Sequence, residues 1–298
     1  MKIVMYHYIR DFKKKYPHFK NFLAKKKFHQ QLDYFIKDLG IISSEEEFTK
    51  NANKYLLTFD DGLKEQVYAA KILAKKKLTG IFFIPTIPLI KNKFLDVHKI
   101  HLLIGKVGGK KLLNYLDKNS KFYNYKNNIL FKTKNKFSKA YSFNKDDSYN
   151  IKFKKYMNYF LDKNSRSKIL NDLFKVFKIN EKVENFYMSK SDISQIKKLG
   201  MIIGSHGHSH QLFSKMNKKE QNKEIVISKK FLEKITKSKI RYFCYPFGRK
   251  YSFNSNTFSL LKKNKFKYAF SVTSKDTNLS NCRNKLELPR YDTNEFIN

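Results

Sequence analysis

The stretch LLTFDDG, residues 56–62, organises the rest of the chain. Apolar and β-favouring residues run into two adjacent carboxylates, Asp60 and Asp61, and then into a glycine, which predicts a buried strand that ends in a turn. Two neighbouring carboxylates repel each other unless a cation lies close to them or one of them holds a proton. The pattern therefore indicates a metal site or an acid/base pair, and the alternative is a solvated Asp-Gly turn.

The composition describes a folded and strongly basic protein. The chain has 298 residues, of which 41% are hydrophobic and 16% aromatic, enough to bury a sizeable core. Its 63 Lys and Arg against 25 Asp and Glu give a formal net charge of +38. Such a charge favours nucleic acid or an anionic membrane surface as a partner, but the lysines are spread over almost every segment. We interpret the charge mainly as compositional bias, with peripheral contact with anionic lipid or attraction to anionic substrates as its functional part.

Cysteine content and hydropathy indicate the compartment. Cys244 and Cys282 are the only cysteines and no CxxC motif is present, which argues against a thiolate metal site and a disulfide scaffold. The apolar run at the N-terminus is too short for a signal peptide, and no stretch approaches the roughly 18 apolar residues of a membrane span. We therefore expect a soluble, cytoplasmic protein.

Strand and helix patterns alternate on both sides of the middle of the chain. A strand at 54–59, an amphipathic helix at 63–77 and a strand at 80–85 form a βαβ unit, which predicts a parallel sheet. Further strands are expected at 2–8, 201–204, 241–247, 268–273 and 286–290. Repeated units with polar residues at the strand ends favour a parallel barrel or a doubly wound sheet.

The segment at about 94–187 has a different character. It is rich in Lys, Asn, Tyr and Phe, and helices are expected near 95–105, 151–162 and 165–177. A long polar stretch around 119–150 separates the first helix from the others. We interpret the chain as one domain over residues 1–298 with a mainly helical insertion at about 94–187.

Three of the eight histidines lie in one short stretch that follows an expected strand. His206 and His210 are four residues apart, so a single helical turn would place both imidazoles on one face. In a parallel barrel this stretch and the Asp-Asp pair would lie at the same rim, which predicts a metal site made of Asp61, His206 and His210. Asp60 would then be free to act as a general base.

Three motifs together resemble a known family. TFDDG at 58–62, HGHSH at 206–210 and YPFG at 245–248, in that order, are similar to the polysaccharide deacetylases of carbohydrate esterase family 4, the NodB homology domain. The resemblance covers about 1–90 and 188–298. It implies an irregular (β/α) barrel and a hydrolase that uses a divalent metal to remove N-acetyl groups from amino sugars. YHY at 6–8 and LPRYD at 288–292 resemble members from bacterial surface-polysaccharide pathways.

The resemblance also implies a role for each matching residue. Asp60 would be the general base, and the metal ligands would be Asp61, His206 and His210. The metal would most commonly be Zn²⁺, with Co²⁺, Ni²⁺ or Fe²⁺ as alternatives. The family motif would also supply residues that bind substrate and stabilise the oxyanion, namely Tyr245, Pro246 and Phe247. The oxyanion would be stabilised mainly by the backbone N–H near Phe247.

Two departures from the family pattern concern the residues around Asp60. The family often has an arginine just before the Pro-aromatic motif, where this chain has Cys244, and Arg290 is our first substitute, ahead of Arg241 and Arg249. Many members use a late histidine to protonate the leaving amine, but no histidine follows His210 here. We take His7, at a strand end on the same rim, as the acid; the alternative is that it only hydrogen-bonds the loop.

The remaining histidines receive no catalytic role. We expect His208 to point away from the metal, and the others to lie on the surface, namely His18, His29, His98 and His101.

The substrate expected from the resemblance is an N-acetylated saccharide. A lipid-linked or nucleotide-linked precursor of surface polysaccharide, such as lipopolysaccharide O-antigen, would suit an enzyme inside the cell. Two alternatives stay open: an inactive relative that binds sugar or metal, and a nucleic-acid-binding protein, which the charge alone favours. No recognition-helix motif or basic arm supports specific nucleic-acid binding, and the sequence leaves the oligomeric state open.

Overall fold

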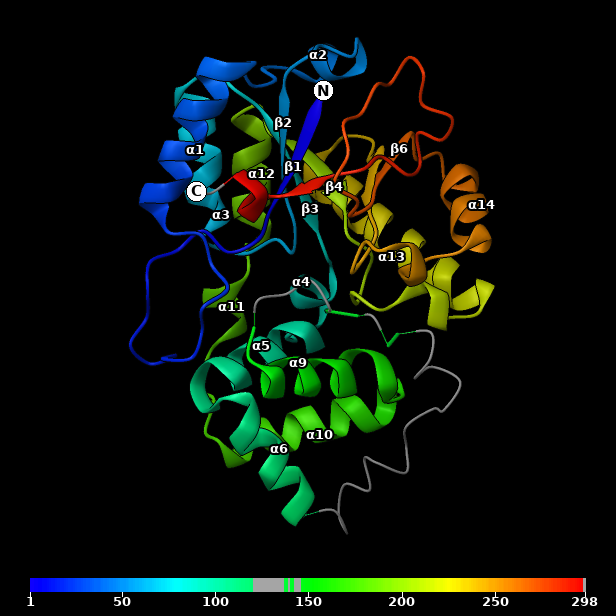
Figure 1. Ribbon diagram of the computed structural model, residues 1–298. Coiled ribbons are helices and arrows are strands. Elements are labelled where there is room, and N and C mark those ends of the chain that lie inside the picture. The colour runs from blue at the N-terminus through cyan, green and yellow to red at the C-terminus, as the bar shows by residue number, and fades with distance from the viewer. Residues whose placement is uncertain (120–136, 139, 142–145, 297–298) are drawn as a thin grey trace. The chain divides into compact units, whose positions relative to one another are not determined.

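The computed structural model describes residues 1–119, 137–138, 140–141 and 146–296 (Figure 1). Much of the polar stretch expected around 119–150 lies outside these residues. The chain forms two compact units. The first unit comprises Met1–Asp11, Phe22–Lys93 and Lys182–Asn298. The second unit comprises Phe12–Asn21 and Phe94–Glu181.

The described part of the first unit contains one sheet of seven parallel strands in the order β6-β5-β4-β3-β2-β1-β7. The strands are β1 (Lys2–Tyr6), β2 (Tyr55–Phe59), β3 (Gly80–Ile84), β4 (Ile202–Ser205), β5 (Tyr242–Cys244), β6 (Tyr268–Phe270) and β7 (Tyr291–Asp292). Figure 1 shows β1, in dark blue, between β2 and the red β7. Tyr6 pairs with Phe59, and Phe59 with Phe82, so neighbouring strands end at nearly the same level. The residues that follow these strands therefore share one rim of the sheet.

Helices follow most strands of the first unit. They are α1 (Lys25–Asp38), α2 (Glu45–Thr49), α3 (Gln66–Lys75), α4 (Ile87–Lys91), α11 (Val183–Phe186), α12 (Lys190–Lys198), α13 (Lys218–Thr236) and α14 (Ser255–Lys263). Short 3₁₀ turns are η2 (Phe213–Lys215), η3 (Lys250–Ser252) and η4 (Thr293–Phe296). Asn217 caps α13 by accepting from the backbone N–H of Glu220, whose carboxylate accepts from the N–H of Asn217, so the sequence pattern there is a true capping box.

Alternating strand residues build two separate cores. One set packs with α1, α3, α12, α13 and α14 on the outer face of the sheet and includes Val4, Leu57, Phe82, Ile203 and Tyr245. The residues adjacent to these along the same strands point to the inner face and pack with Phe48 of α2. They include Ile3, Leu56, Phe83, Ile202 and Cys244. Because the main helices cover the outer face alone, the sheet is a curled half-barrel, and the expected irregular (β/α) barrel is confirmed rather than a doubly wound sheet.

The described part of the second unit is helical. It contains α5 (Asp96–Val107), α6 (Gly109–Lys118), α9 (Ser148–Lys155), the π-helical turn η1 (Tyr156–Phe160) and α10 (Lys163–Val176). The helix expected at 151–162 is thus α9 followed by a π-helical turn, and α6 was not expected. Asp162 begins α10 by accepting from the N–H groups of Asn164 and Ser165, and Arg166 Nε lies 2.8 Å from the Asp96 carboxylate.

Two features differ from the sequence expectations. The last strand is Tyr291–Asp292 rather than 286–290, where Leu288 forms only an isolated bridge with Phe270. The strand expected at 241–247 ends at Cys244, because Pro246 lacks a backbone donor and Phe247 has a left-handed φ of 65°. None of the described helices is both long and apolar enough to cross a membrane.

Candidate active site

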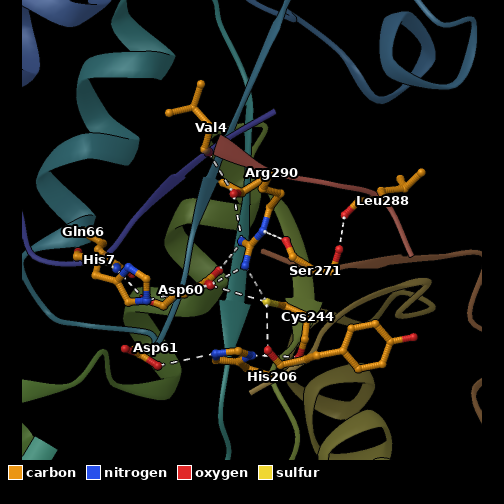
Figure 2. Close-up of polar contacts among 12 residues, drawn as sticks. Val4, His7, Asp60, Asp61, Gln66, His206, Cys244, Ser271, Leu288 and Arg290 are labelled. Atoms are coloured by element: carbon orange, nitrogen blue, oxygen red, sulfur yellow. Dashed lines mark hydrogen bonds and ion pairs between the residues drawn. The ribbon is translucent and has the colours of Figure 1, made fainter. Parts of the chain in front are cut away.

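Side chains from the inner face of the half-barrel meet at the carboxyl ends of the strands. The period of two that places Ile3 and Leu56 on the inner face also directs His7 and Asp60 inward, because each lies four residues further along its chain segment. The same alternation directs the side chain of Cys244 inward and that of Tyr245 outward. Figure 2 shows the Asp60 carboxylate facing Arg290 and Cys244, with His7 and Gln66 on its other side.

Arg290 holds the Asp60 carboxylate from the side of β7. Its Nη1 and Nη2 donate to Oδ1 and Oδ2 of Asp60, both at 2.8 Å, and it is fully buried. The remaining N–H groups donate to Thr58 Oγ1 at 3.0 Å, Ser271 O at 3.1 Å and Cys244 Sγ at 3.0 Å. All five guanidinium donors therefore have partners, which fixes the orientation of the carboxylate.

This pairing keeps Asp60 ionised. Burial raises the pKa of Asp60, but the charge and hydrogen bonds of Arg290 more than offset burial, so the pKa is lowered to about 2. The pKa of Arg290 is raised, because the attraction of Asp60 outweighs the effect of burial. Asp60 is thus a buried carboxylate that stays ionised over the whole neutral range, the state that a proton acceptor requires.

Cys244 occupies the position where the family often has an arginine. Its Sγ lies 3.4 Å from Asp60 Oδ2, and burial raises the pKa of the thiol, so the group is a neutral thiol. The arginine contact comes instead from Arg290. Arg241, one of the other two substitutes considered, has an exposed side chain whose Nη1 is 4.0 Å from Glu45, and Arg249 is exposed.

Asp61, His206 and His210 form a buried donor set. Asp61 Oδ1 lies 3.5 Å from His206 Nε2 and 3.4 Å from His210 Nε2. Ligand atoms that share one tetrahedral ion at about 2.1 Å lie about 3.4 Å from one another. Two imidazole nitrogens and one carboxylate oxygen are a common donor set for zinc and related divalent ions. The residues present therefore fit the metal that the resemblance implies.

The orientation of His206 also suits a ligand. Its Nδ1 lies 2.8 Å from the carbonyl oxygen of Cys244, so an N–H at Nδ1 donates to this carbonyl and leaves the lone pair of Nε2 directed at Asp61. Burial lowers the pKa of His206, although Asp60 and Asp61 act in the opposite direction. The neutral imidazole that metal binding requires is thereby favoured.

The histidine stretch is a loop, so the expected helical turn is wrong. Residues 206–212 have no helical structure, Gly207 has a φ of 74° and His210 has a φ of 54°. Asp61 and Phe247 also have left-handed φ values, of 78° and 65°. Three residues with side chains thus adopt a conformation that costs about 1–2 kcal/mol each, a kind of strain that gathers at functional sites. The bend of the loop, rather than helical spacing, brings the two imidazoles together.

His7 lies at the open side of Asp60. Its Nε2 is 4.0 Å from Asp60 Oδ2, and its side chain is 39% exposed, so a substrate can reach it. Gln66 at the start of α3, which the sequence did not single out, is fully buried and donates from Nε2 to the carbonyl oxygens of His7 at 3.0 Å and Asp60 at 2.6 Å. A single helix residue therefore ties together the ends of β1 and β2.

In the YPFG stretch, Phe247 lies beside His210, whereas Tyr245 points into the outer core. The hydroxyl of Tyr245 donates to Leu286 O at 2.6 Å, its N–H donates to Phe270 O, and its ring stacks on Phe253 in the outer core. These contacts are those of a packing residue, and the substrate or oxyanion role expected for Tyr245 stays a prediction. Phe247 stays at the site, with its ring centroid 5.1 Å from that of His210, and Pro246 joins the two.

The other histidines occupy different surroundings. His208 Nδ1 lies 2.9 Å from Thr86 Oγ1, and its carbonyl accepts from the N–H groups of Thr86 and Ile87, so this side chain points away from Asp61. The surface position expected for His98 is wrong, because it is fully buried on the same face of α5 as Leu102. His18 is exposed, while His29 and His101 are partly buried.

Comparisons with known proteins agree with this fold. Residues 174–269 match the family model of polysaccharide deacetylase, a span that contains both histidines of the donor set and the YPFG stretch. No curated protein sequence matches the chain. Among solved structures, the chain is similar to the deacetylase PplD of Streptococcus pyogenes in complex with acetate, with 16% identity, a TM-score of 0.60, and coverage of 98% of this chain and 91% of that chain.

Two further structures extend the similarity. IcaB from Ammonifex degensii has 14% identity and a TM-score of 0.58 over 98% of this chain and 91% of that one. A de-N-acetylase from Aggregatibacter actinomycetemcomitans has 13% identity and a TM-score of 0.54 over 97% of this chain and 93% of that one. The fold is that of the polysaccharide deacetylases, and the resemblance seen in the sequence motifs is confirmed.

Proposed function

We propose that this protein is a metal-dependent hydrolase that removes N-acetyl groups from amino sugars. The proposal rests on the different surroundings of two adjacent carboxylates, Asp60 and Asp61. Arg290 holds Asp60 ionised at 2.8 Å, whereas Asp61 Oδ1 lies 3.4–3.5 Å from two histidine nitrogens. The first arrangement suits a proton acceptor and the second suits a metal ligand.

Asp61, His206 and His210 would hold the divalent ion, for which zinc is our first choice. When bound, such an ion supplies Lewis-acid chemistry that polarises an amide carbonyl and acidifies water. Asp60 takes the proton of the attacking water, and the backbone N–H of Phe247 donates to the carbonyl oxygen of the acetamide. His7 gives a proton to the amine nitrogen as the C–N bond breaks, so that acetate and a free amine leave.

The contact between Arg290 and Asp60 favours an active enzyme over an inactive relative. An inactive relative was considered because no histidine follows His210 and because Cys244 replaces an arginine. The second reason is weakened because the guanidinium of Arg290 reaches Asp60 instead. The exposed His7 beside Asp60 offers a second titratable group at the same place. These two contacts supply both members of an acid/base pair.

An acetate-release assay tests the proposal. The protein is incubated with N-acetylglucosamine oligomers after loading with Zn²⁺, Co²⁺ or Ni²⁺, and acetate is measured with and without EDTA. We expect release that depends on the metal and stops on chelation. A metal-loaded protein that releases no acetate from any N-acetylated amino sugar would contradict the proposal.

For the substrate, we propose a saccharide linked to a nucleotide or a lipid through pyrophosphate, as in precursors of surface polysaccharide. The net charge of +38 supports an anionic carrier, because it raises the local concentration of anions. The expected result is a lower KM for a nucleotide-linked N-acetyl sugar than for the free sugar, with a difference that shrinks as salt is added. Equal KM values for the two substrates at low salt would contradict this choice of carrier.

A further inference from the structure

A buried carboxylate from α13 lies beneath the loop that joins His206 to His210. Glu224 is 8% exposed, and its Oε2 accepts from the backbone N–H groups of His208 at 2.9 Å and Ser209 at 2.6 Å. Its Oε1 accepts from the hydroxyl of Ser209 at 2.5 Å. The Glu224 carboxylate thus accepts three hydrogen bonds from the two residues directly before His210.

A second residue on the same face of α13 holds the beginning of the loop. Ser228, one helical turn after Glu224, accepts from the hydroxyl of Ser205 at 2.8 Å, and Ser205 Oγ accepts from the N–H of Gly207 at 3.2 Å. Glu224 and Ser228 are four residues apart, so both face the loop from one side of the helix. The helix therefore contacts the loop on both sides of His206.

The loop needs such contacts because its backbone is strained. Gly207 and His210 have left-handed φ values of 74° and 54°, and helical hydrogen bonds do not support either residue. A Cβ added at Gly207 would lie 3.6 Å from Glu224 Oε2. The backbone thus passes close over the carboxylate, and the charge-assisted hydrogen bonds favour the bent loop over straighter alternatives.

We propose that Glu224 is a positioning residue for the metal site, which sets the separation of the His206 and His210 nitrogens by holding the loop between them. This inference rests on the proposed metal-binding role of Asp61, His206 and His210. The Glu224 carboxylate accepts from two backbone N–H groups and one serine hydroxyl of the loop, so it acts on the ligands through the backbone. Partners that hydrogen-bond the ligands directly typically change metal affinity about 10- to 100-fold when they are replaced, so we expect an effect at the lower end of this range for Glu224.

The key variant is Glu224→Gln, which keeps the size of the side chain. An amide offers one accepting oxygen in place of two, so it cannot accept from both N–H groups and the Ser209 hydroxyl together. The matched control is Gln221→Met on the same helix. Gln221 is fully buried and hydrogen-bonded to Met216 O and Thr257 Oγ1, which lie outside the loop. Replacing it should therefore destabilise α13 without removing any hydrogen bond to the loop that carries His210.

The experiment measures the Kd of Co²⁺ and of Zn²⁺ for each purified variant by competition with a chromophoric chelator, and the Tm without metal. We expect about tenfold weaker binding for Glu224→Gln and wild-type affinity for Gln221→Met at a comparable Tm. Unchanged affinity in Glu224→Gln, or equal loss in both variants, would overturn the proposal. If Glu224→Gln does not fold, Ser209→Ala removes only the contact to Oε1, and unchanged affinity there would overturn it.

Acetate release by the wild-type protein separates this inference from the proposed function. If wild type binds Co²⁺ and Zn²⁺ but releases no acetate, the deacetylase proposal fails while the affinity comparison still decides the role of Glu224. If wild type releases acetate and Glu224→Gln binds metal normally, the function stands and the positioning role fails.

Discussion

Arg290 donates one hydrogen bond to each carboxylate oxygen of Asp60, both at 2.8 Å, from a position 230 residues later in the chain. The contact exists because β7 pairs with β1, and β1 pairs with β2, so that the long side chain of Arg290, which directly precedes β7, reaches Asp60 along the inner face of the sheet. A fully buried guanidinium with five hydrogen-bond partners does not reorient easily. The proposed base is therefore fixed in direction as well as in charge.

Replacing Arg290 should destabilise the fold, because it leaves a buried carboxylate without its cation. We expect Arg290→Met to lower the free energy of unfolding by about 3–5 kcal/mol, and the double variant Asp60→Asn with Arg290→Met to recover part of the loss. Urea unfolding measures both. Arg166→Met, which breaks an ion pair with Asp96 in the second unit, is the control for losing a buried arginine elsewhere. A double variant no more stable than Arg290→Met would argue against coupling between the two residues.

The same substitution should change the pH dependence. With Arg290 present, the pKa of Asp60 is about 2 against an ordinary 3.8, so its stabilising contribution is complete above pH 3.8 and is lost as the pH falls towards 2. Without Arg290, burial raises the pKa, and Asp60 becomes protonated at higher pH. The acid limb of kcat/KM in Arg290→Met should therefore move to higher pH. A profile that coincides with that of wild type would show that Arg290 does not set the charge of Asp60.

Cys244 should matter less than Arg290. Its Sγ lies 3.4 Å from Asp60 Oδ2, and because a thiol is a weak donor this hydrogen bond should contribute about 1.5 kcal/mol, the low end for a charged acceptor, or roughly tenfold in rate. We expect Cys244→Ala to lower kcat/KM by less than about tenfold and to keep the pH profile of wild type. Steady-state kinetics of both variants provide the comparison. If Cys244→Ala is as damaging as Arg290→Met, the thiol has a larger role than its contacts indicate.

His7 should be needed for poor leaving groups only. An amine must be protonated as it leaves, whereas an aryl oxide leaves without a proton, and general acids contribute about 10²- to 10⁴-fold. We expect His7→Ala to lose at least about 10²-fold in acetate release from N-acetyl sugars and to retain hydrolysis of an aryl acetate. The exposed His18 provides the control variant. Equal losses on both substrates would assign His7 to binding or folding instead.

Local patterns predicted much of the rim of the sheet. Parallel strands that end at one level place the residues after them together, so the positions of LLTFDDG and HGHSH at strand ends already indicated a shared site. The structure brings Asp61 Oδ1 within 3.4–3.5 Å of the Nε2 atoms of His206 and His210. The helical turn expected for HGHSH was wrong because left-handed φ values at Gly207 and His210 replace it with a bent loop.

Contacts from helix faces were harder to predict. Gln66 and Glu224 act on backbone atoms of the rim, so no pairing of side-chain types signals them. The available signal for Glu224 was its place on the apolar stripe of α13, beside Ile225 and Leu232. His98 was misplaced for the same reason, since it shares a buried helix face with Leu102. The alternation along the strand directs Tyr245 outward, opposite to Cys244, a feature that the family motif alone did not reveal.

The most direct test of the account pairs metal content with acetate release in Asp60→Asn and Asp61→Asn. Asp60 faces Arg290 and Asp61 faces the two histidines, so the account gives the neighbours separate tasks. Asp60→Asn should bind zinc as wild type does and lose nearly all acetate release, and Asp61→Asn should lose both. Full acetate release by Asp60→Asn, or wild-type zinc binding by Asp61→Asn, would contradict the account.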